Sequence, residues 1–480
     1  MDRGVGDGPV RIDHSEIEIA GKQLDFSGKH VLVIGTKRSG VAAVELLVKH
    51  GAQVRVMDAQ PPTKEEQAKF AAMGVPVVPQ SPEYVLEARK DDALKDPDII
   101  VLSPAVAFDL PMLMSARLRG IPVIGEVELA SYFLKGPVIG ITGSNGKTTT
   151  TALTGHVLKQ CGIACQVGGN IGTAVTSLID SSAPDHWNVL ELSSFQLESI
   201  SHFRAEIAAC LNLTPDHLDR HHTFEAYAAA KARLFDTQNA GDFAVLNFDD
   251  PVAKTFADRT KAEVWWFSSH RQVPAGVWMR EGELYFDTHP FLHRSQIKLR
   301  GLHNVENVMA ASVIARLAGA SVDAIANAVE MFLGVEHRIE FVRSLNGVEY
   351  FNDSKATNVD AALKAIEAFS SGLWMIAGGK DKESDYTPLR EPLAQKARAV
   401  LLIGADPPYP HAAAPLMEKA LKGALPLVRC GTLANAVRYA REHATPGDVV
   451  LLAPACASFD QFESYEHRGN VFKQLVGELS

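Results

Sequence analysis

Residues 138–150 read VIGITGSNGKTTT, an apolar run that leads into a glycine-rich turn and then into a helix, predicted from about Thr148 to Gln160. The backbone N–H groups of such a turn and the N-terminus of the following helix form a cradle for phosphate oxygens. Lys147 is placed to neutralise the outer phosphates of a nucleotide, and the Thr148 hydroxyl is placed to bind Mg²⁺. The strict phosphate-loop pattern is incomplete, because Ile141 stands where its first glycine belongs. A plain strand-to-helix turn is the alternative, but the strand, the glycines and the GKTTT run together favour a phosphate loop.

Before this loop, strand-like and helix-like runs alternate along the chain. The runs are HVLVIG (30–35), VAAVELLVKHG (41–51), QVRVMD (53–58), DIIVLSP (98–104) and IPVIGEVEL (121–129). This alternation is the pattern of an open parallel sheet with crossover helices.

The turn GTKRSG (35–40) resembles a dinucleotide fingerprint, with Asp58 at the end of the next strand. Lys37 replaces the middle glycine, at the position where the backbone should closely approach a pyrophosphate, so the motif disfavours NAD. Binding of another nucleotide's pyrophosphate and a plain structural turn both stay open on this motif alone.

After the phosphate loop the strand candidates continue in two groups. The first group comprises WNVLEL (187–192), EIAACLNL (206–213) and FAVLNF (243–248), then short strands within 262–300 (VWWFS, GVWMR, ELYF and IKLR) that suggest an antiparallel edge, and a helical stretch at 305–332. The second group comprises VEYFND (348–353), LWMIAGG (373–379), AVLLIG (399–404) and DVVLLAPA (448–455).

The predicted fold class is therefore α/β, with three successive Rossmann-like or P-loop-type units and mostly parallel sheets. We predict domains at 1–135, 136–334 and 335–480.

The composition limits the classes of protein that fit. The chain has 480 residues, 46% of them hydrophobic and 22% charged, as is typical of a globular protein. Its formal net charge of −10 disfavours nucleic acid or a membrane surface as a partner, because polyanion binders usually carry an excess of basic residues. The five cysteines form no CxxC pair, and the sequence shows no signal peptide or membrane-spanning run, so we expect a cytoplasmic protein.

Three titratable residues follow the phosphate loop. Glu191 ends a predicted strand, where a carboxylate near a phosphate loop is expected to hold Mg²⁺ directly or through its ligands. His217 lies in LNLTPDHLDRHH (211–222), just after a strand, and Lys231 lies on the predicted helix 226–235. Taken alone, a solvated histidine and an exposed helix lysine are the more frequent outcomes.

A series of stretches along nearly the whole chain resembles the Mur ligase family, in that family's order. They are TGSNGKTTT (142–150), GGNIG (168–172), ELSSFQLE (191–198), LNLTPDHLDRH (211–221), AAK (229–231), HNVENVMAA (303–311) and HRIE (337–340). NDSKATN (352–358) and CASFDQFESYEHRGN (456–470) are similar to the member of the family that adds D-glutamate. The resemblance implies an ATP-dependent acid–amino-acid ligase that joins D-glutamate to UDP-N-acetylmuramoyl-L-alanine through an acyl phosphate, forming ADP and phosphate during peptidoglycan precursor synthesis.

The resemblance also implies roles for single residues and units. The catalytic residues would be Lys147, Glu191, His217 and Lys231. ATP would be bound by Gly143, Ser144, Asn145, Gly146, Lys147, Thr148, Thr149, Asn307, Arg338 and Asp353. The other substrates would be bound by Arg38, Ser39, Asp58, Ser103, Asn170, Lys355, Thr357, Lys382, Ser458 and Tyr465. Two Mg²⁺ ions would be held by Thr148, Glu191, His217 and Lys231, the last as a carbamate. The first predicted domain would bind the UDP substrate, the second ATP and the third the incoming amino acid, in a protein expected to be a monomer.

Three positions depart from the family's pattern. Ala105 follows Ser103 and Pro104 where the family usually has glycine, and Lys37 also stands where glycine is usual. Tyr465 replaces a phenylalanine, which adds a hydroxyl that needs a hydrogen-bond partner. The alternatives are a folylpoly-γ-glutamate synthetase-like ligase, which should lack the N-terminal unit and the NDSKATN stretch, an NAD-dependent oxidoreductase, and a non-catalytic nucleotide-binding regulator.

Overall fold

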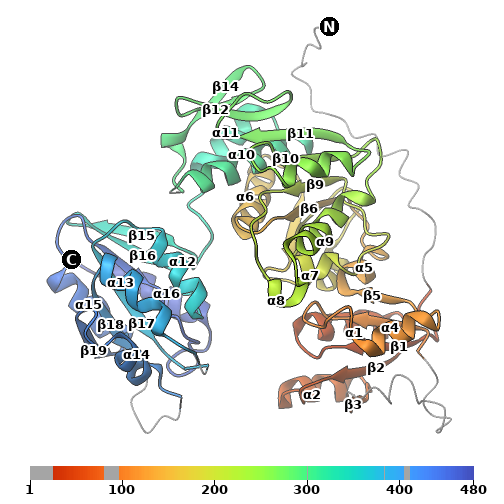
Figure 1. Ribbon diagram of the computed structural model, residues 1–480, viewed down its shortest axis with the longest axis horizontal. Coiled ribbons are helices and arrows are strands. Elements are labelled where there is room, and N and C mark those ends of the chain that lie inside the picture. Colours follow the sequence, from red (N-terminus) through yellow and green to blue (C-terminus); the bar gives the residue numbers. More distant parts are fainter. Residues whose placement is uncertain (1–24, 80–96, 300, 383, 405–410) are drawn as a thin grey trace. The chain divides into compact units, whose positions relative to one another are not determined.

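Three β-sheets organise the computed structural model of this chain (Figure 1). The structure describes residues 25–79, 97–299, 301–382, 384–404 and 411–480. The chain divides into two units, Met1–Phe332 with two of the sheets and Leu333–Ser480 with the third. The predicted α/β class with three mostly parallel sheets is confirmed. The boundaries of three separate domains stay a prediction.

The first sheet is parallel throughout and has the strand order β3-β2-β1-β4-β5. Its strands are β1 (His30–Ile34), β2 (Gln53–Asp58), β3 (Val77–Pro79), β4 (Ile99–Leu102) and β5 (Val123–Gly125), and its helices are α1 (Arg38–Lys49), α2 (Lys64–Ala72) and α4 (Pro111–Leu118). The run 121–129 contributes only the three residues of β5, because Glu126–Ser131 turns into helix α5. In β1 and β4, Ile34 lies opposite Leu102, so the loops that follow both strands start at the same edge.

The second sheet has nine strands in the order β14-β13-β12-β11-β10-β9-β6-β8-β7. The strands are β6 (Val138–Thr142), β7 (Cys165–Gly169), β8 (Trp187–Glu191), β9 (Ile207–Cys210), β10 (Phe243–Asn247), β11 (Glu263–Ser268), β12 (Gly276–Arg280), β13 (Glu283–Phe286) and β14 (His289–His293). Strands β12 to β14 pair antiparallel, as predicted for this edge, and the others pair in parallel. The predicted strand IKLR is wrong: the chain leaves β14 into the short helix η4 (Arg294–Gln296), and residues 297–299 form no strand.

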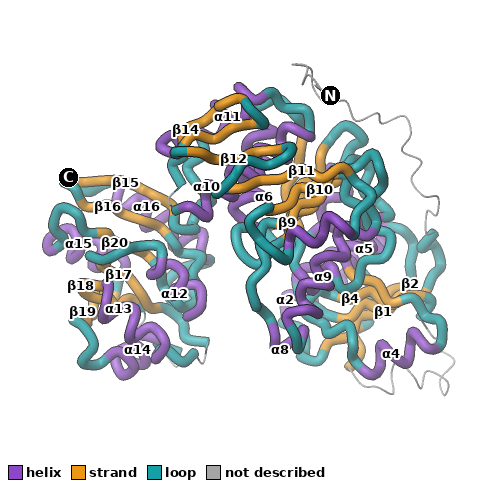
Figure 2. Tube along the Cα trace, turned by 45° about the horizontal axis from the view of Figure 1, so that its top comes forward, coloured by secondary structure: helices purple, strands orange, loops and turns teal. Residues whose placement is uncertain are grey.

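Helices cover both faces of the nine-stranded sheet (Figure 2). They are α6 (Lys147–Gln160), α7 (Ser194–Leu197), α8 (Leu218–His221), α9 (Phe224–Asp236), α10 (Leu302–Leu317) and α11 (Val322–Met331), with the short helices η2 (Val175–Ser181) and η3 (Ala253–Asp258). Helices α6 and α10 pack against each other and against the strands on one face. On the other face α9 lies close to β6, where a Cβ added to Gly140 would stand 3.0 Å from Leu234 Cδ1.

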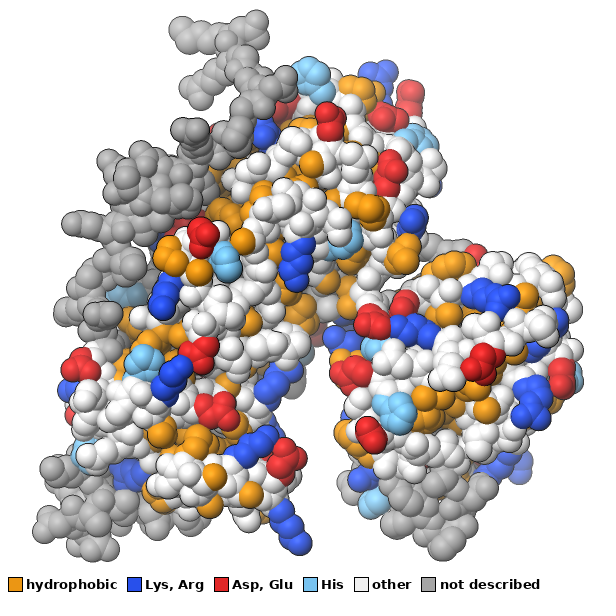
Figure 3. All heavy atoms as spheres, turned by 180° about the vertical axis from the view of Figure 1, so that it is seen from behind, with side chains coloured by type: hydrophobic (Ala, Val, Ile, Leu, Met, Phe, Trp, Pro, Cys, Tyr) orange, Lys and Arg blue, Asp and Glu red, His pale blue; other side chains and the backbone are white. Residues whose placement is uncertain are grey.

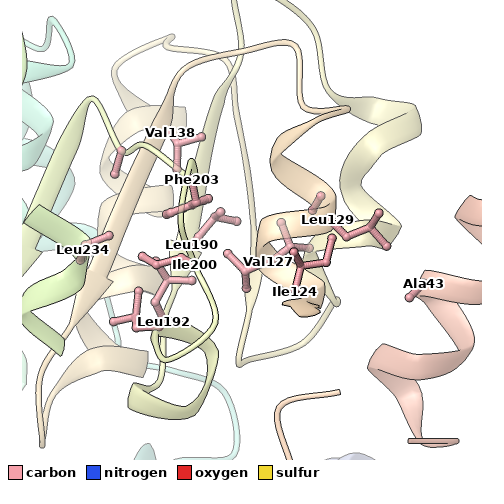
Figure 4. Packing of buried hydrophobic residues seen from close by; sticks show 14 of the residues in the cluster. Ala43, Ile124, Val127, Leu129, Val138, Leu190, Leu192, Ile200, Phe203 and Leu234 are labelled. Atoms are coloured by element: carbon pink, nitrogen blue, oxygen red, sulfur yellow. The ribbon is translucent and has the colours of Figure 1, made fainter. Parts of the chain in front are cut away.

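One hydrophobic core joins the first two sheets. It runs from the α1 side of the first sheet through α5 and η2 to the face of the second sheet that α9 covers. Figure 4 shows side chains of this core, with Val127 and Leu129 on α5 and with Leu190, Leu192 and other apolar side chains on the side of the second sheet. Because these contacts are continuous, residues of both sheets belong to the single unit Met1–Phe332.

The unit Leu333–Ser480 has its own six-stranded sheet in the order β15-β16-β20-β17-β18-β19. The strands are β15 (Glu340–Leu345), β16 (Val348–Asn352), β17 (Leu373–Gly378), β18 (Ala397–Ile403), β19 (Leu427–Gly431) and β20 (Val449–Leu452). The helices are α12 (Val359–Glu367), η5 (Thr387–Leu389), α13 (Arg390–Lys396), α14 (Ala413–Leu421), α15 (Leu433–His443) and α16 (Tyr465–Gly477). Helices α12 to α14 and helices α15 and α16 form two separate cores on opposite faces of the sheet, and only β15 pairs antiparallel.

Two surface features bear on possible partners. Among the described residues, no helix has the length and apolar character needed to cross a membrane. On the face that Figure 3 shows, Lys and Arg side chains of the described residues are interspersed with Asp and Glu. The described side chains on that face therefore form no broad basic patch of the kind that binds nucleic acid.

Candidate active site

The predicted phosphate loop joins β6 to α6. Gly143 (φ +149°) and Gly146 (φ +83°) take backbone conformations that favour glycine, and Gly146 caps the N-terminus of α6. Lys147 is the first residue of the helix, and its Nζ donates to the carbonyl oxygens of Gly143 and Ser144, each at 2.8 Å. The backbone N–H groups and a cation thus converge on one short turn, which is the arrangement that binds phosphate.

Several residues that the sequence did not point to hold this loop in place. The Asn145 N–H donates to Asn212 Oδ1 at 2.8 Å, and the Ser144 N–H donates to the Asn212 carbonyl at 2.8 Å. Ser144 Oγ lies 2.9 Å from the Tyr227 hydroxyl and donates to the Thr214 carbonyl at 2.9 Å. Asn212 and Thr214 fall within the LNLTPDHLDRH stretch, but local spacing gives no sign that they support the phosphate loop.

Asn307 of α10 packs directly on the loop; its role in ATP binding stays a prediction. A Cβ added to Gly146 would stand only 2.2 Å from Asn307 Oδ1. The Asn307 amide is fixed on both sides, since Oδ1 accepts from Thr150 Oγ1 at 3.2 Å and Nδ2 donates to Asn304 Oδ1 at 3.0 Å.

Lys231 is buried, not exposed. It is only 1% exposed, and its Nζ donates to the Gly143 carbonyl at 2.9 Å and to Thr142 Oγ1 at 3.4 Å. Burial, and then the nearby charge of Lys147, lower the pKa of Lys231 to about 7. A large part of this amine is therefore neutral near neutral pH, and the common outcome of an exposed helix lysine does not apply here.

Glu191 lies beside the phosphate loop because β8 pairs in parallel with β6, with Ile141 opposite Glu191. The side chain is 2% exposed; Oε1 accepts from Asn170 Nδ2 at 2.9 Å, and Oε2 is buried without a hydrogen-bond partner in the structure. A buried carboxylate oxygen without a partner is costly unless a ligand or an ion completes it. The hydroxyl-bearing Thr148 of the loop is also buried.

His217 is half-exposed and lies in the loop between β9 and α8. Its backbone is left-handed (φ 52°), its Nε2 is 3.7 Å from Asp216 Oδ2, and its ring is 4.8 Å from the ring of Phe195. Among the residues that the structure describes, no three His, Cys, Asp or Glu side chains form a group that could hold a metal. A metal at this site would therefore need other donors as well, such as a hydroxyl, a phosphate or a modified lysine.

The residues predicted to bind the UDP substrate follow the strands of the first sheet. Asp58 Oδ2 accepts from the backbone N–H and the hydroxyl of Thr36, both at 2.7 Å. Burial acts to raise the pKa of Asp58, but the hydrogen bonds from Gln60 and Thr36 outweigh it and hold that pKa below its usual value. The Arg38 guanidinium donates to the Gly172 carbonyl, which links this edge to the GGNIG loop. Ser39 is half-buried in the first turn of α1.

A small pocket lies at this edge inside the unit Met1–Phe332. Ser103, Val106, Glu126, Gln196 and other residues line it. The sequence singled out Ser103 alone, because the pocket is assembled from segments that follow β4, β5 and β8.

The remaining predicted residues belong to the unit Leu333–Ser480. They are Arg338, Asp353, Lys355, Thr357, Lys382, Ser458 and Tyr465. Most lie on loops that follow β16, β17 and β20, whereas Arg338 precedes β15 and Tyr465 begins α16. Burial raises the pKa of Asp353 to about 7, against the charges of Arg338 and Lys355, which act to lower it. Ser458 is buried, whereas Lys382 is exposed.

Arg468 is a site-supporting residue that the sequence did not reveal. It is 1% exposed, and it donates to Ser354 Oγ at 2.9 Å, to the Ser354 carbonyl at 2.9 Å and to the Cys456 carbonyl at 3.2 Å. It therefore connects the loop after β16 with the loop after β20. The carbonyl of Tyr465 accepts from Ser354 Oγ at 2.8 Å, which brings Tyr465 to the same place.

Known protein families match three stretches of this chain. Residues 29–125 match the Mur ligase MurD-like N-terminal domain, residues 141–315 the Mur ligase middle domain, and residues 337–456 the Mur ligase glutamate ligase domain. A UDP-N-acetylmuramoylalanine--D-glutamate ligase of Solibacter usitatus is 55% identical over 456 residues, which cover 95% of this chain and 99% of that protein. The chain belongs to the Mur ligase family.

Two further proteins are similar to this chain. A ligase of the same name from Acidobacterium capsulatum is 50% identical over 461 residues, covering 94% of this chain and 97% of that protein. The crystal structure of UDP-N-acetylmuramate-alanine ligase from Thermotoga maritima is 19% identical, with a TM-score of 0.53 over 94% of this chain and all of that one, and shares the fold.

Proposed function

We propose that this chain is an ATP-dependent ligase that joins D-glutamate to UDP-N-acetylmuramoyl-L-alanine, a step of peptidoglycan precursor synthesis. The observation that carries the proposal is the 55% identity to a ligase of that name, which extends over 99% of that relative. The match of residues 29–125 to an N-terminal domain disfavours a folylpoly-γ-glutamate synthetase-like ligase, which should lack that unit.

Each predicted domain has a part in this proposal. Residues 1–135 bind the UDP substrate, with Arg38, Ser39, Asp58 and Ser103 near it, and Asn170 serves the muramoyl end. Residues 136–334 bind ATP. Residues 335–480 bind D-glutamate, whose carboxylates suit the cations Lys355 and Lys382.

The reaction needs activation of a carboxylate. A carboxylate oxygen of the substrate's alanine attacks the terminal phosphorus of ATP, and the bond to ADP breaks as the acyl phosphate forms. The neutral amine of D-glutamate then attacks the acyl carbon, phosphate leaves, and the nitrogen loses a proton. Lys147 and the N–H groups of the phosphate loop stabilise the charge on the transferring phosphoryl group.

Mg²⁺ fits the residues present at this loop. The unpartnered Oε2 of Glu191 and the hydroxyl of Thr148 are hard oxygen donors of the kind that Mg²⁺ prefers. We propose that they hold magnesium, together with His217 and Lys231. When bound, Mg²⁺ would offset negative charge on the phosphate oxygens.

Lys231 would offer Mg²⁺ the oxygen donors that it prefers once its amine has been modified. With a pKa of about 7, the neutral amine can attack carbon dioxide; an N–C bond forms and one proton is released, which leaves an anionic carbamate. An ammonium group would repel a cation, whereas a carbamate offers two oxygen donors. We propose that Lys231 carries this carbamate and that the protein is a monomer in the cytoplasm.

Phosphate release with a panel of substrates tests the proposal. Release should require both UDP-N-acetylmuramoyl-L-alanine and D-glutamate, and L-glutamate, L-alanine, diaminopimelate and folate substrates should not replace them. Equal release with another amino acid, or release that ignores the UDP substrate, would refute the assignment.

A further inference from the structure

A hydroxyl–carboxylate pair lies beneath the loops that follow β17 and β20. Tyr386 is 2% exposed, and its hydroxyl donates to Asp381 Oδ1 at 2.6 Å and lies 3.2 Å from Cys456 Sγ. The short distance is typical of a hydrogen bond to a charged acceptor. Burial first, and then the neighbouring Cys456 and Asp381, raise the pKa of Tyr386, so the phenol keeps the proton that it donates.

Asp381 lies at the end of a segment whose backbone is fixed by hydrogen bonds. The Lys380 N–H donates to the Ala457 carbonyl at 3.0 Å, the Ala457 N–H donates to the Lys380 carbonyl at 3.2 Å, and the Asp381 N–H donates to the His411 carbonyl at 2.7 Å. These backbone bonds hold the chain up to Asp381. The next residue, Lys382, is exposed and directly follows Asp381.

The Asp381 side chain accepts hydrogen bonds from residues further along the chain. Its Oδ1 accepts from the Tyr386 hydroxyl and, at 3.3 Å, from the Ser384 N–H. Tyr386 also contacts Cys456, two residues before Ser458. One phenol thus contacts the residue before Lys382 and a residue two positions before Ser458, and Lys382 and Ser458 are the residues assigned to the incoming amino acid.

We propose that Tyr386 and Asp381 form a clamp that positions Lys382 for the incoming amino acid, so that Tyr386 is a positioning residue for D-glutamate. The clamp rests on the proposed function, because that function assigns Lys382 to the amino acid. It adds a residue whose hydroxyl never has to touch substrate.

Steady-state kinetics of Tyr386→Phe test the clamp. Loss of a hydrogen bond to a charged group should raise the KM for D-glutamate about ten-fold. The KM for ATP, the KM for the UDP substrate and kcat should each stay within about two-fold, because the clamp acts on the binding of D-glutamate alone. Tyr350→Phe is the matched control, because Tyr350 lies buried in β16 of the same unit and its hydroxyl has no hydrogen-bond partner in the structure.

A double-mutant cycle separates a clamp from a general loss of stability. Asp381→Ala should raise the KM for D-glutamate as Tyr386→Phe does, and the double variant should be no worse than the worse single variant. Additive effects, an unchanged KM for D-glutamate, or an equal rise of all three KM values would overturn the clamp.

Amide hydrogen exchange gives a readout that does not depend on the reaction. In Tyr386→Phe the amides of residues 380–382 should exchange faster than in the wild type and in Tyr350→Phe, with the rest of the unit unchanged. If the wild type shows no D-glutamate-dependent turnover, the proposed function fails, while exchange still decides the clamp. Unchanged exchange at 380–382 refutes it.

Discussion

Lys231 and Glu191 bring two buried ionisable groups next to the phosphate loop. Water cannot satisfy either of them, since Lys231 is 1% and Glu191 is 2% exposed. Glu191 has an oxygen without a partner, and the pKa of Lys231 is lowered to about 7 by burial and by Lys147. Groups perturbed in this way are concentrated at functional sites, because a ligand can supply the missing interactions.

Lys147→Ala should lower phosphate release by about a thousand-fold, because it removes the cation that stabilises the transferring phosphoryl group. The fold should survive, because the hydrogen bonds that Nζ of Lys147 makes to loop carbonyls are local to the loop. Stopped assays of phosphate release, with thermal unfolding of the same sample, measure both effects. Lys159→Ala, at the exposed end of the same helix, is the control and should keep wild-type turnover.

Lys231→Met should abolish most turnover, by about a hundred-fold or more, and yet raise thermal stability near neutral pH. The folded-state pKa of about 7 lies below the ordinary value of 10.5. Between these two values the unfolded chain binds more protons, so the contribution of Lys231 to stability is unfavourable below pH 7 and recovers as the pH rises. The gain in Tm of the variant should therefore shrink from about pH 7 to about pH 10.

Thermal unfolding across this pH window, in buffer freed of carbon dioxide, measures that gain. Lys159→Met controls for the loss of a positive charge and should show no such trend. A gain in Tm that stays constant with pH would contradict a neutral buried amine.

At the scale of single elements, the start of α6 combines backbone geometry with a tight contact. Gly146 has φ +83° and faces the fixed amide of Asn307, so the turn tolerates no side chain there. Gly162, after the other end of α6, has a similar φ of +73° but no atom within 4 Å of an added Cβ. The two glycines therefore separate backbone strain from steric contact.

Gly162→Ala should cost about 1 kcal/mol of stability from backbone strain alone and leave ATP affinity unchanged. Gly146→Ala should cost more, because Asn307 must also give up its bonds to Thr150 and Asn304, and ATP affinity should fall more than about ten-fold. Titration calorimetry with ATP and thermal unfolding measure the two quantities. Equal losses of ATP affinity in both variants would show that the contact with Asn307 has no part in nucleotide binding.

At the scale of the whole molecule, the cores differ in how many sheets they join. One core extends across the first two sheets, whereas the sheet of Leu333–Ser480 has two cores of its own. A continuous core unfolds cooperatively, because loss of one side exposes the apolar surface of the other.

Calorimetry of the unliganded chain should therefore give two unfolding transitions. A fragment starting at Leu333 should fold alone and reproduce one of them, since its core is complete without the rest of the chain. Three separate transitions would show that the first two sheets unfold independently. A fragment without a cooperative transition would contradict an independent second unit.

The sequence by itself determined the local features of this protein. The strand, turn and helix around 138–150 depend on residues within a few positions of one another, and the structure places β6 and α6 where they were predicted. The parallel strands and the antiparallel edge also follow from short-range patterns. The prediction was wrong for residues 297–299, which form no strand, and incomplete for Glu126–Ser131, which forms a helix directly after β5.

Only the tertiary structure decided how the groups of the candidate site are paired and solvated. The spacing of residues 226–235 allowed an exposed lysine, but packing of α9 on β6 buries Lys231 against Thr142 and Gly143. The unpartnered oxygen of Glu191 and the bond between Tyr386 and Asp381 likewise depend on which loops meet at the end of a sheet. Burial, pKa and hydrogen-bond completion are properties of a residue's neighbours in space, and those neighbours come from segments that local propensity cannot bring together.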